Sequence, residues 1–376
     1  MSVEEKFLIR NLFNMEGVLN LSRRLKNMYP RFDESGFVQF IEAQLAPLSF
    51  SERISLISNA IEKFLPVEFE TAADILVKSL PEPHSKELKE MGGFMVLPLS
   101  NFIARKGLDH FELSLNALFE MTLRASAEFD IRHFIVKYPE ATMQKLEELA
   151  LHPDAAARRL ASEGSRPRLP WGIRLQNFVS NPTPVLKILE LLKDDPALDV
   201  RRSVANNLND ISKDNPQIVM DTLKKWKIDA TPEREWVINH SLRTLFKKGN
   251  KESLELQGFP ANINVAIDEI ELSKKEIKLG ESLILSFSLQ NKGDSEVSLM
   301  VDYGIHFKKA NGSNQLKVFK LAKRNIKPGE KVKFSRKISI VPITTRVYYP
   351  GEQPVDVRVN GNLMGSATFL LHTFQS

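Results

Sequence analysis

The spacing of apolar residues changes its period once along the chain, near Pro260, and this change restricts the fold to two successive kinds of structure. Before Pro260, apolar residues recur every three or four positions, as they do on one face of an α-helix. This spacing is clear in the segments 50–65, 111–125, 141–151 and 185–194. Short amphipathic helices separated by proline-containing steps are typical of an α-solenoid, so we predict one here.

An internal repeat supports the solenoid. The segments HPDAAARRLASE (152–163) and DPALDVRRSVAN (195–206) share a proline that is followed, at the same offset, by a pair of arginines. The two prolines lie 43 residues apart, within the period of about 40–47 residues of HEAT and armadillo repeats. The segment 231–249 is a candidate third copy. We therefore predict a HEAT-like α-solenoid.

After Pro260 the sequence pattern is that of a β-domain. The segments 264–273, 282–291 and 332–341 alternate apolar and polar residues, and turn sequences such as NKGD, KPGE and VNGN separate the expected strands. Several short strands of this kind predict an immunoglobulin-like β-sandwich, here without the usual disulfide. The expected domains are 1–257 for the solenoid and 262–376 for the sandwich.

Charge is distributed unevenly along the chain. Residues 1–150 hold 17 basic and 22 acidic residues, residues 151–250 hold 17 and 12, and residues 261–376 hold 17 and 11. Such asymmetry favours a polyanionic partner, although surface lysines also serve solubility. The segment 317–337 has nine basic residues and one acid. It is either a solvated hairpin or an edge that binds phosphates.

The sequence lacks the residues that several classes of chemistry require. The chain has no cysteine, which excludes disulfides, thiolate metal sites and a cysteine nucleophile. It has no Walker loop, HExxH or GxSxG motif, and its seven histidines are scattered. We expect no metal and no cofactor. The N-terminus lacks the features of a signal peptide, and no apolar run approaches the ~20 residues of a membrane span, so we expect a soluble cytoplasmic protein.

Three acids on the predicted helices are candidate functional groups. Glu163 lies four residues after Arg159, on the same helix face, and Asp210 lies eight residues after Arg202 on the equivalent repeat helix. Glu128 is expected to begin another helix. Structural roles remain open for all three, namely a surface ion pair, a position near a helix end and an interaction with a helix dipole.

Three stretches resemble a known family. AEFDIRHFI, HPDAAARRLASEGSRPRLPWG and EREWVINHSLRTLFKKG are similar to the AlkC family of bacterial alkylpurine DNA glycosylases, and SEGSRPRLPW is the most specific of these elements. The resemblance covers most of residues 1–257, and some members carry a C-terminal immunoglobulin-like domain. It implies a monofunctional enzyme that removes cationic alkylated bases, chiefly 3-methyladenine, from double-stranded DNA without full base flipping.

The resemblance also implies site residues. It places the family's catalytic carboxylates at Glu128, Glu163 and Asp210. With the charge pattern, it leads us to expect DNA contacts from Arg158, Arg159, Arg166, Arg168, Trp171, Arg201, Arg202, Lys323, Arg324 and Lys327.

Alternatives remain at this stage. Trp171 is equally compatible with a core position. The chain could be a non-enzymatic HEAT-repeat scaffold that binds DNA or protein, or an inactive paralogue that only recognises damaged DNA. Convergence of the three acids on one concave, basic surface would distinguish an enzyme from a scaffold. We expect a monomer.

Overall fold

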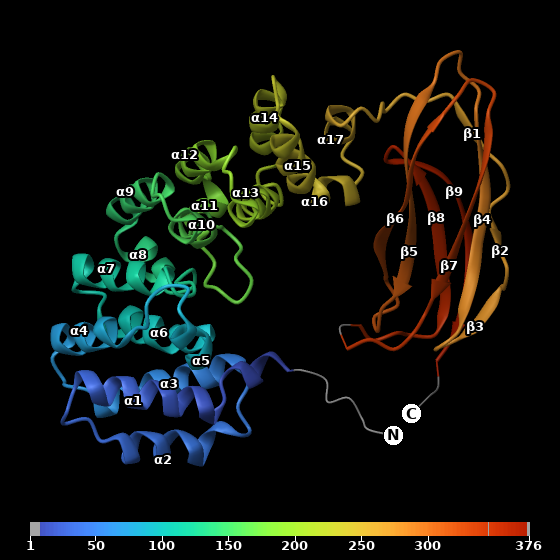
Figure 1. The fold of residues 1–376 in the computed structure, drawn as a ribbon. Helices are drawn as coiled ribbons and strands as arrows, with labels where there is room; N and C mark the ends of the chain where they lie inside the picture. Colours follow the sequence, from blue (N-terminus) through green and yellow to red (C-terminus); the bar gives the residue numbers. More distant parts are fainter. Residues whose placement is uncertain (1–7, 345, 374–376) are drawn as a thin grey trace. The chain divides into compact units, whose positions relative to one another are not determined.

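The structure is a computed structural model that describes residues 8–344 and 346–373. Within these ranges, the named elements are helices up to Leu256 and strands from Val265 onward (Figure 1). This order confirms the predicted succession of an α-region and a β-region. Among the described residues, no helix is both long and apolar enough to cross a membrane.

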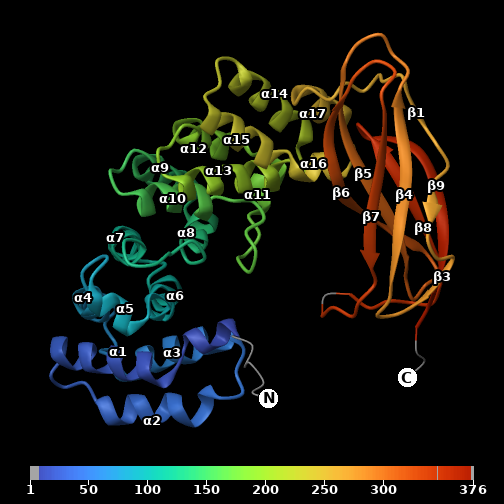
Figure 2. The same ribbon diagram turned by 45° about the vertical axis from the view of Figure 1, so that its right-hand side comes forward.

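The helices form stacked layers. Helices three apart in chain order pack against each other, for example α1 with α4, α7 with α10 and α10 with α13, as in a solenoid (Figures 1 and 2). Two 3₁₀ helices, η1 (Ile9–Leu12) and η2 (Gly93–Val96), accompany them. The α-helices are α1 (Met15–Met28), α2 (Glu34–Leu45), α3 (Phe50–Phe64), α4 (Phe69–Ser79), α5 (Lys86–Met91), α6 (Leu97–Lys106), α7 (Phe111–Thr122), α8 (Ile131–Lys137), α9 (Pro139–Ala150), α10 (Ala155–Gly164), α11 (Gln176–Ser180), α12 (Thr183–Leu192), α13 (Leu198–Ile211), α14 (Pro216–Lys227), α15 (Pro232–Ser241), α16 (Arg243–Lys247) and α17 (Lys251–Leu256).

The two copies of the sequence repeat have the same local structure. Each copy forms a helix, α10 in the first and α13 in the second, and the two helices pack together. In both copies the first arginine of the pair closes the loop before its helix. Arg158 donates to the carbonyls of residues 152 and 153 at 2.9 and 2.7 Å, and Arg201 donates to those of residues 195 and 196 at 2.6 and 2.9 Å.

The chain divides into two compact units that do not follow the change from helix to strand. One unit holds the residues up to 215 together with 230–241, and the other holds 216–229 and 242 onward. Helices α14, α16 and α17 therefore group with the strands. The domain limits of 1–257 and 262–376 stay a prediction.

The strands form two sheets. In the first, β4 pairs with β1, β2 and β7, and in the second the order is β3-β9-β8-β5-β6. All pairs are antiparallel except β3 with β9. The strands are β1 (Val265–Ile267), β2 (Glu271–Leu272), β3 (Glu276–Lys278), β4 (Ser282–Asn291), β5 (Val297–Lys308), β6 (Asn314–Ile326), β7 (Lys331–Ser339), β8 (Gly351–Val359) and β9 (Asn362–His372).

The core of the β-region lies between these sheets. Alternate residues of β4, such as Leu285 and Phe287, are buried against Val301 and Ile305 of β5 and Val357 of β8. Each sheet thus turns one apolar face inward, as in a sandwich. This arrangement confirms the predicted immunoglobulin-like architecture, and apolar packing without a disulfide holds it together.

The structure corrects one expectation for the strands and excludes one of two alternatives. The predicted strand 264–273 is two short strands, β1 and β2, because Asp268 and Glu269, which disfavour strand structure, lie between them. The segment 317–337 is not a hairpin, because β6 pairs with β5 in one sheet and β7 pairs with β4 in the other. Strand β6 is instead the edge of the five-stranded sheet.

Candidate active site

The site is built around the end of α10 and the loop 165–175 that follows it. Gly164 is the last residue of this helix and also serves packing. A Cβ at Gly164 would lie 2.7 Å from Cγ2 of Ile131, so the glycine lets α8 approach α10 closely. Pro167 has no N–H and disfavours helical backbone at the residue before it, so the helix cannot continue.

Arg132, on α8, fixes this loop in place. Its side chain is fully buried and donates to the carbonyl of Ile173 at 2.8 Å, of Gly164 at 2.9 Å and of Arg166 at 2.7 Å. Burial, followed by repulsion from the neighbouring Arg166, lowers the pKa of Arg132 to about 10. Sequence reasoning missed this residue, because one arginine in the apolar stretch IRHFIV carries no signal of its partners.

Arg166 joins two of the three predicted carboxylates. Its Nη1 lies 2.5 Å from Oε1 of Glu163, and its Nη2 lies 2.7 Å from Oδ2 of Asp210. All three side chains are buried. Burial opposes the charge of Arg166, but attraction to Glu163 and Asp210 outweighs it and raises the pKa of Arg166. Acids from consecutive repeats therefore meet at one guanidinium group.

Further donors occupy the other oxygens of these two acids. The Ser203 hydroxyl donates to Oε2 of Glu163. The Lys213 ammonium donates to Oδ1 of Asp210 at 2.7 Å. Lys213 is the partly exposed member of this group. Each carboxylate is therefore bound at both oxygens, which fixes its orientation.

Glu128, the third predicted acid, lies in the turn before α8 rather than at the start of a helix. Its Oε2 accepts from Arg159 and from Ser126, each at 2.7 Å. The i, i+4 pair expected between Arg159 and Glu163 is not formed, because Arg159 reaches across to Glu128 and Glu163 binds an arginine of the loop instead.

The three acids converge. Glu128, Glu163 and Asp210 all lie near enough to Arg132 for their charges to favour its protonated form. We call these three side chains the acid cluster. Arginines lie between its members, so the structure brings together the predicted carboxylates inside a group of cations.

Arg158 and Arg201, two of the predicted DNA-binding arginines, bind the loops that precede helices α10 and α13. Arg158 is mostly buried and binds Asp195 through Nε at 2.5 Å and Nη2 at 3.0 Å, so it links α10 to the loop before α13. Arg201 closes its own loop in the same way as Arg158. Arg158 therefore links the two repeats, and Arg201 fixes the loop of the second. A contact with DNA stays a prediction for each.

Arg168 and Arg202 are more accessible. Arg168 forms a two-pronged pair with Asp214, at 2.6 and 2.5 Å, and both side chains keep some exposure. Arg202 is half exposed and lies 2.6 Å from Asp199 at the surface. Surface pairs of this kind contribute little stability and exchange partners easily. Both arginines remain candidates for phosphate contacts.

Trp171 is not a core residue. Its side chain is 76% exposed, and its φ of +65° lies in the left-handed region that a bulky residue rarely adopts. The loop therefore holds the indole outward against an intrinsic backbone cost. The indole lies 5.5 Å, between ring centroids, from Phe50 of α3.

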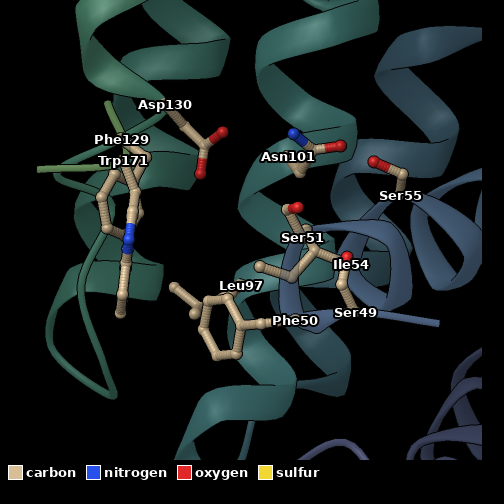
Figure 3. Close-up of a pocket in the computed structure, with 10 residues that line it drawn as sticks. All are labelled: Ser49, Phe50, Ser51, Ile54, Ser55, Leu97, Asn101, Phe129, Asp130 and Trp171. Atoms are coloured by element: carbon tan, nitrogen blue, oxygen red, sulfur yellow. The ribbon is translucent and has the colours of Figure 1, made fainter. Parts of the chain in front are cut away.

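A cavity of about 460 Å³ lies beside Trp171 (Figure 3). We call it the Trp171 cavity. The carboxyl of Asp130 lies in its wall and accepts from the Ser100 hydroxyl at 2.6 Å. Burial raises the pKa of Asp130 to about 7. The cavity is lined by Ser49, Phe50, Ser51, Ile54, Ser55, Leu97, Asn101, Phe129, Asp130 and Trp171.

The predicted basic residues of the β-region lie in the other compact unit. Lys323, Arg324 and Lys327 are exposed at the end of edge strand β6 and line a surface hollow of about 620 Å³. The Lys323 ammonium lies 4.8 Å from the centre of the Phe259 ring. Burial, followed by repulsion from Lys320, lowers the pKa of Lys323. Their contact with DNA stays a prediction.

Metal ligands are not grouped in the part of the chain that the structure describes. Within residues 8–344 and 346–373, no three histidine, aspartate or glutamate side chains are placed to hold a metal ion. The acid cluster contacts side-chain cations of the protein itself.

Comparisons with known proteins agree with this architecture. Residues 266–373 match the family model described as "Uncharacterised protein YhaZ, C-terminal Ig-like domain". The chain is 34% identical over 362 residues to the uncharacterized protein YhaZ of Bacillus subtilis, covering 96% of this chain and 98% of the relative. It is 36% identical to the solved Pseudomonas fluorescens alkylpurine DNA glycosylase AlkC bound to DNA containing an abasic site analog, with a TM-score of 0.90 over 97% of this chain and 100% of that one.

Proposed function

The chain belongs to the AlkC family of alkylpurine DNA glycosylases, and on this premise we propose that it hydrolyses the N-glycosidic bond of cationic alkylated purines, chiefly 3-methyladenine, in double-stranded DNA. One observation of the structure supports the proposal most strongly. Glu163 and Asp210, from consecutive repeats, share the guanidinium group of Arg166, and Glu128 lies close by.

The chemistry needs negative charge near the sugar. Methylation at N3 gives adenine a positive charge, so the glycosidic bond breaks with its electron pair going to the base nitrogen. The base leaves neutral, and the positive charge remains on an oxocarbenium-like sugar. Carboxylates stabilise that charge by electrostatic preorganisation. Water then adds to C1′ and gives its proton to a carboxylate acting as general base.

The arginines control access to the acids. Glu163 is 5% exposed and Asp210 is 1% exposed, so neither meets DNA while Arg166 holds both. A docking duplex brings phosphates that compete for guanidinium groups. Arg159 is one-third exposed and exchanges most easily, which frees Glu128. The positive charge of the lesion then takes the place of an arginine beside the acids.

The products follow from this scheme. No lysine is assigned to a Schiff base with the sugar, so the expected product is an abasic site in an unbroken strand. The protein acts as a monomer in the bacterial cytoplasm, where its DNA substrate lies. A non-enzymatic scaffold or an inactive damage-binding paralogue is a weaker interpretation, because neither requires three acids gathered around buried arginines.

The variant Glu163→Gln tests the proposal. It keeps the shape of the side chain and removes its charge, and we expect at least about a 100-fold loss of rate, as for other single electrostatic groups at active sites. The measurement is single-turnover release of 3-methyladenine from methylated duplex DNA, separated by chromatography. Binding to duplex DNA, followed by fluorescence anisotropy, should be largely retained.

A matched control removes the same charge elsewhere. Glu148, on α9, is more than half exposed and pairs with Lys145 at the surface, so Glu148→Gln should release base at the rate of the unaltered protein. Thermal unfolding of each variant checks that it is folded. If Glu163→Gln releases base as fast as the control, the assigned role of the acid cluster is wrong.

A further inference from the structure

The Trp171 cavity lacks the positive charge of the other sites that are predicted to contact DNA. Among the residues that line it, none is a lysine or an arginine, and Asp130 is the one ionisable group. A cavity without arginine or lysine lacks the side-chain cations through which proteins usually bind a phosphate. Its volume of about 460 Å³ lies in the range of small-molecule sites.

Aromatic rings border one side of the Trp171 cavity. Trp171 and Phe50 lie 5.5 Å apart with a tilt of 40°, so both present ring surface to an occupant. The carboxyl of Asp130 and the amide of Asn101 lie on the side opposite Phe50 (Figure 3). Planar nucleobases stack against such surfaces, because each base offers a π-face for stacking and polar edges for hydrogen bonds.

The polar side of the cavity has unused hydrogen-bonding capacity. Oδ1 of Asn101 is buried, and it has no hydrogen-bond partner among residues 8–344 and 346–373. A buried acceptor without a partner is costly, so a ligand that donates to it gains affinity. Asp130 titrates near neutral pH, because burial raises its pKa to about 7, and its carboxyl can therefore donate or accept. A carboxyl and an amide together offer donors and acceptors that can pair with the polar edge of a purine.

The cavity also adjoins the acid cluster along the chain. Glu128 directly precedes Phe129 and Asp130, which both line the cavity. Arg166, which binds the other two acids, lies in the loop that carries Trp171. The turn before α8 and the loop 165–175 therefore each carry a cavity residue together with an acid of the cluster or the arginine that binds it.

We propose that the Trp171 cavity binds the free purine base that the reaction releases, stacked on Trp171 and Phe50 and hydrogen-bonded to Asp130 and Asn101. This inference rests on the proposed glycosylase function. The occupant is the base after the glycosidic bond has broken. The catalytic acids therefore act on the sugar, and this cavity retains the departing product.

Calorimetric titration of the full chain with free 3-methyladenine tests the proposal. Asn101→Leu removes the unpartnered acceptor at nearly constant size and should weaken binding about tenfold. Ser55→Phe adds a ring from an exposed position of α3 that lines the cavity, and should block binding. Asn177→Leu, an exposed change on α11 outside the lining, is the matched control and should bind like the unaltered chain.

The outcomes separate this inference from the proposed function. Saturable binding that Asn101→Leu and Ser55→Phe weaken supports the cavity assignment, even if the protein releases no base from DNA, a result that would overturn the proposed function alone. Base release by a protein that binds no free purine would overturn the cavity assignment alone. If the two variants weaken binding to undamaged duplex DNA and leave free-base binding unchanged, the occupant is a base of the duplex and the product assignment is wrong.

Discussion

Asp130 makes the stability of the helical unit depend on pH in a direction opposite to that of most carboxylates. Its side chain is buried, and burial raises its pKa from 3.8 to about 7. In the unfolded chain the same group is solvated and titrates at its ordinary value. Between these two pKa values the folded state binds more protons than the unfolded state. The free energy of unfolding therefore falls as the pH rises from about 4 to about 7.

The size of the effect follows from the shift. A displacement of roughly three pKa units corresponds to about 4 kcal/mol, which is lost above pH 7, whereas less than half of it is lost at pH 5. Asp130→Asn is neutral at every pH and keeps an acceptor for the Ser100 hydroxyl. Relative to the unaltered protein, the variant should therefore gain about 3 kcal/mol in unfolding free energy between pH 5 and pH 8.

Urea unfolding followed by far-ultraviolet circular dichroism measures this difference, because the helical signal reports mainly on the unit that holds Asp130. The control is Asp74→Asn, which changes a half-exposed carboxylate on α4 paired with Lys78. The control should alter stability by less than about 1 kcal/mol at both pH values. A stability difference for Asp130→Asn that stays constant from pH 5 to pH 8 would refute the reasoning.

Three further predictions concern the arginines and the β-region. Arg132→Met removes the hydrogen bonds that hold the loop 165–175. It should slow base release about 100-fold, because small misplacements of catalytic groups have effects of this size. An unchanged rate would show that the loop keeps its position without Arg132. Arg158→Met uncovers a buried carboxylate and should lower the unfolding free energy by about 3–5 kcal/mol, whereas Arg202→Met should change it by less than about 1 kcal/mol; equal urea midpoints would contradict this. The double change Arg324→Glu and Lys327→Glu should reduce the slope of log affinity against log salt for duplex DNA by about 2, and an unaltered slope would remove β6 from the interface.

The elements of this fold could be predicted where a local pattern was strong. The alternation over 282–291 corresponds to β4 (Ser282–Asn291), and the helical spacing over 185–194 corresponds to α12 (Thr183–Leu192). The expected strand 264–273 was wrong because two acids interrupt it. The choice between a hairpin and an edge for 317–337 stayed open in the sequence, because pairing between strands is not a local property.

The site was only partly predictable. The family resemblance indicated Glu128, Glu163 and Asp210, and the structure brings them together. The pairing of acids with arginines was missed, because the contact from Arg166 to Asp210 spans 44 residues and that from Arg132 to the loop spans 41. The i, i+4 rule selects partners on one helix, and it cannot weigh a partner brought close by a neighbouring repeat.

By itself, the sequence determined the two architectures, their order and the repeat of about 43 residues, because hydrophobic period and turn residues act over a few positions at a time. Only the tertiary structure decided which arginines support the fold and which form ion pairs with the acid cluster. The difference depends on burial, because the three residues have the same side chain. The stacking of repeats places Arg158 between helices, Arg166 between two carboxylates and Arg132 under the loop 165–175.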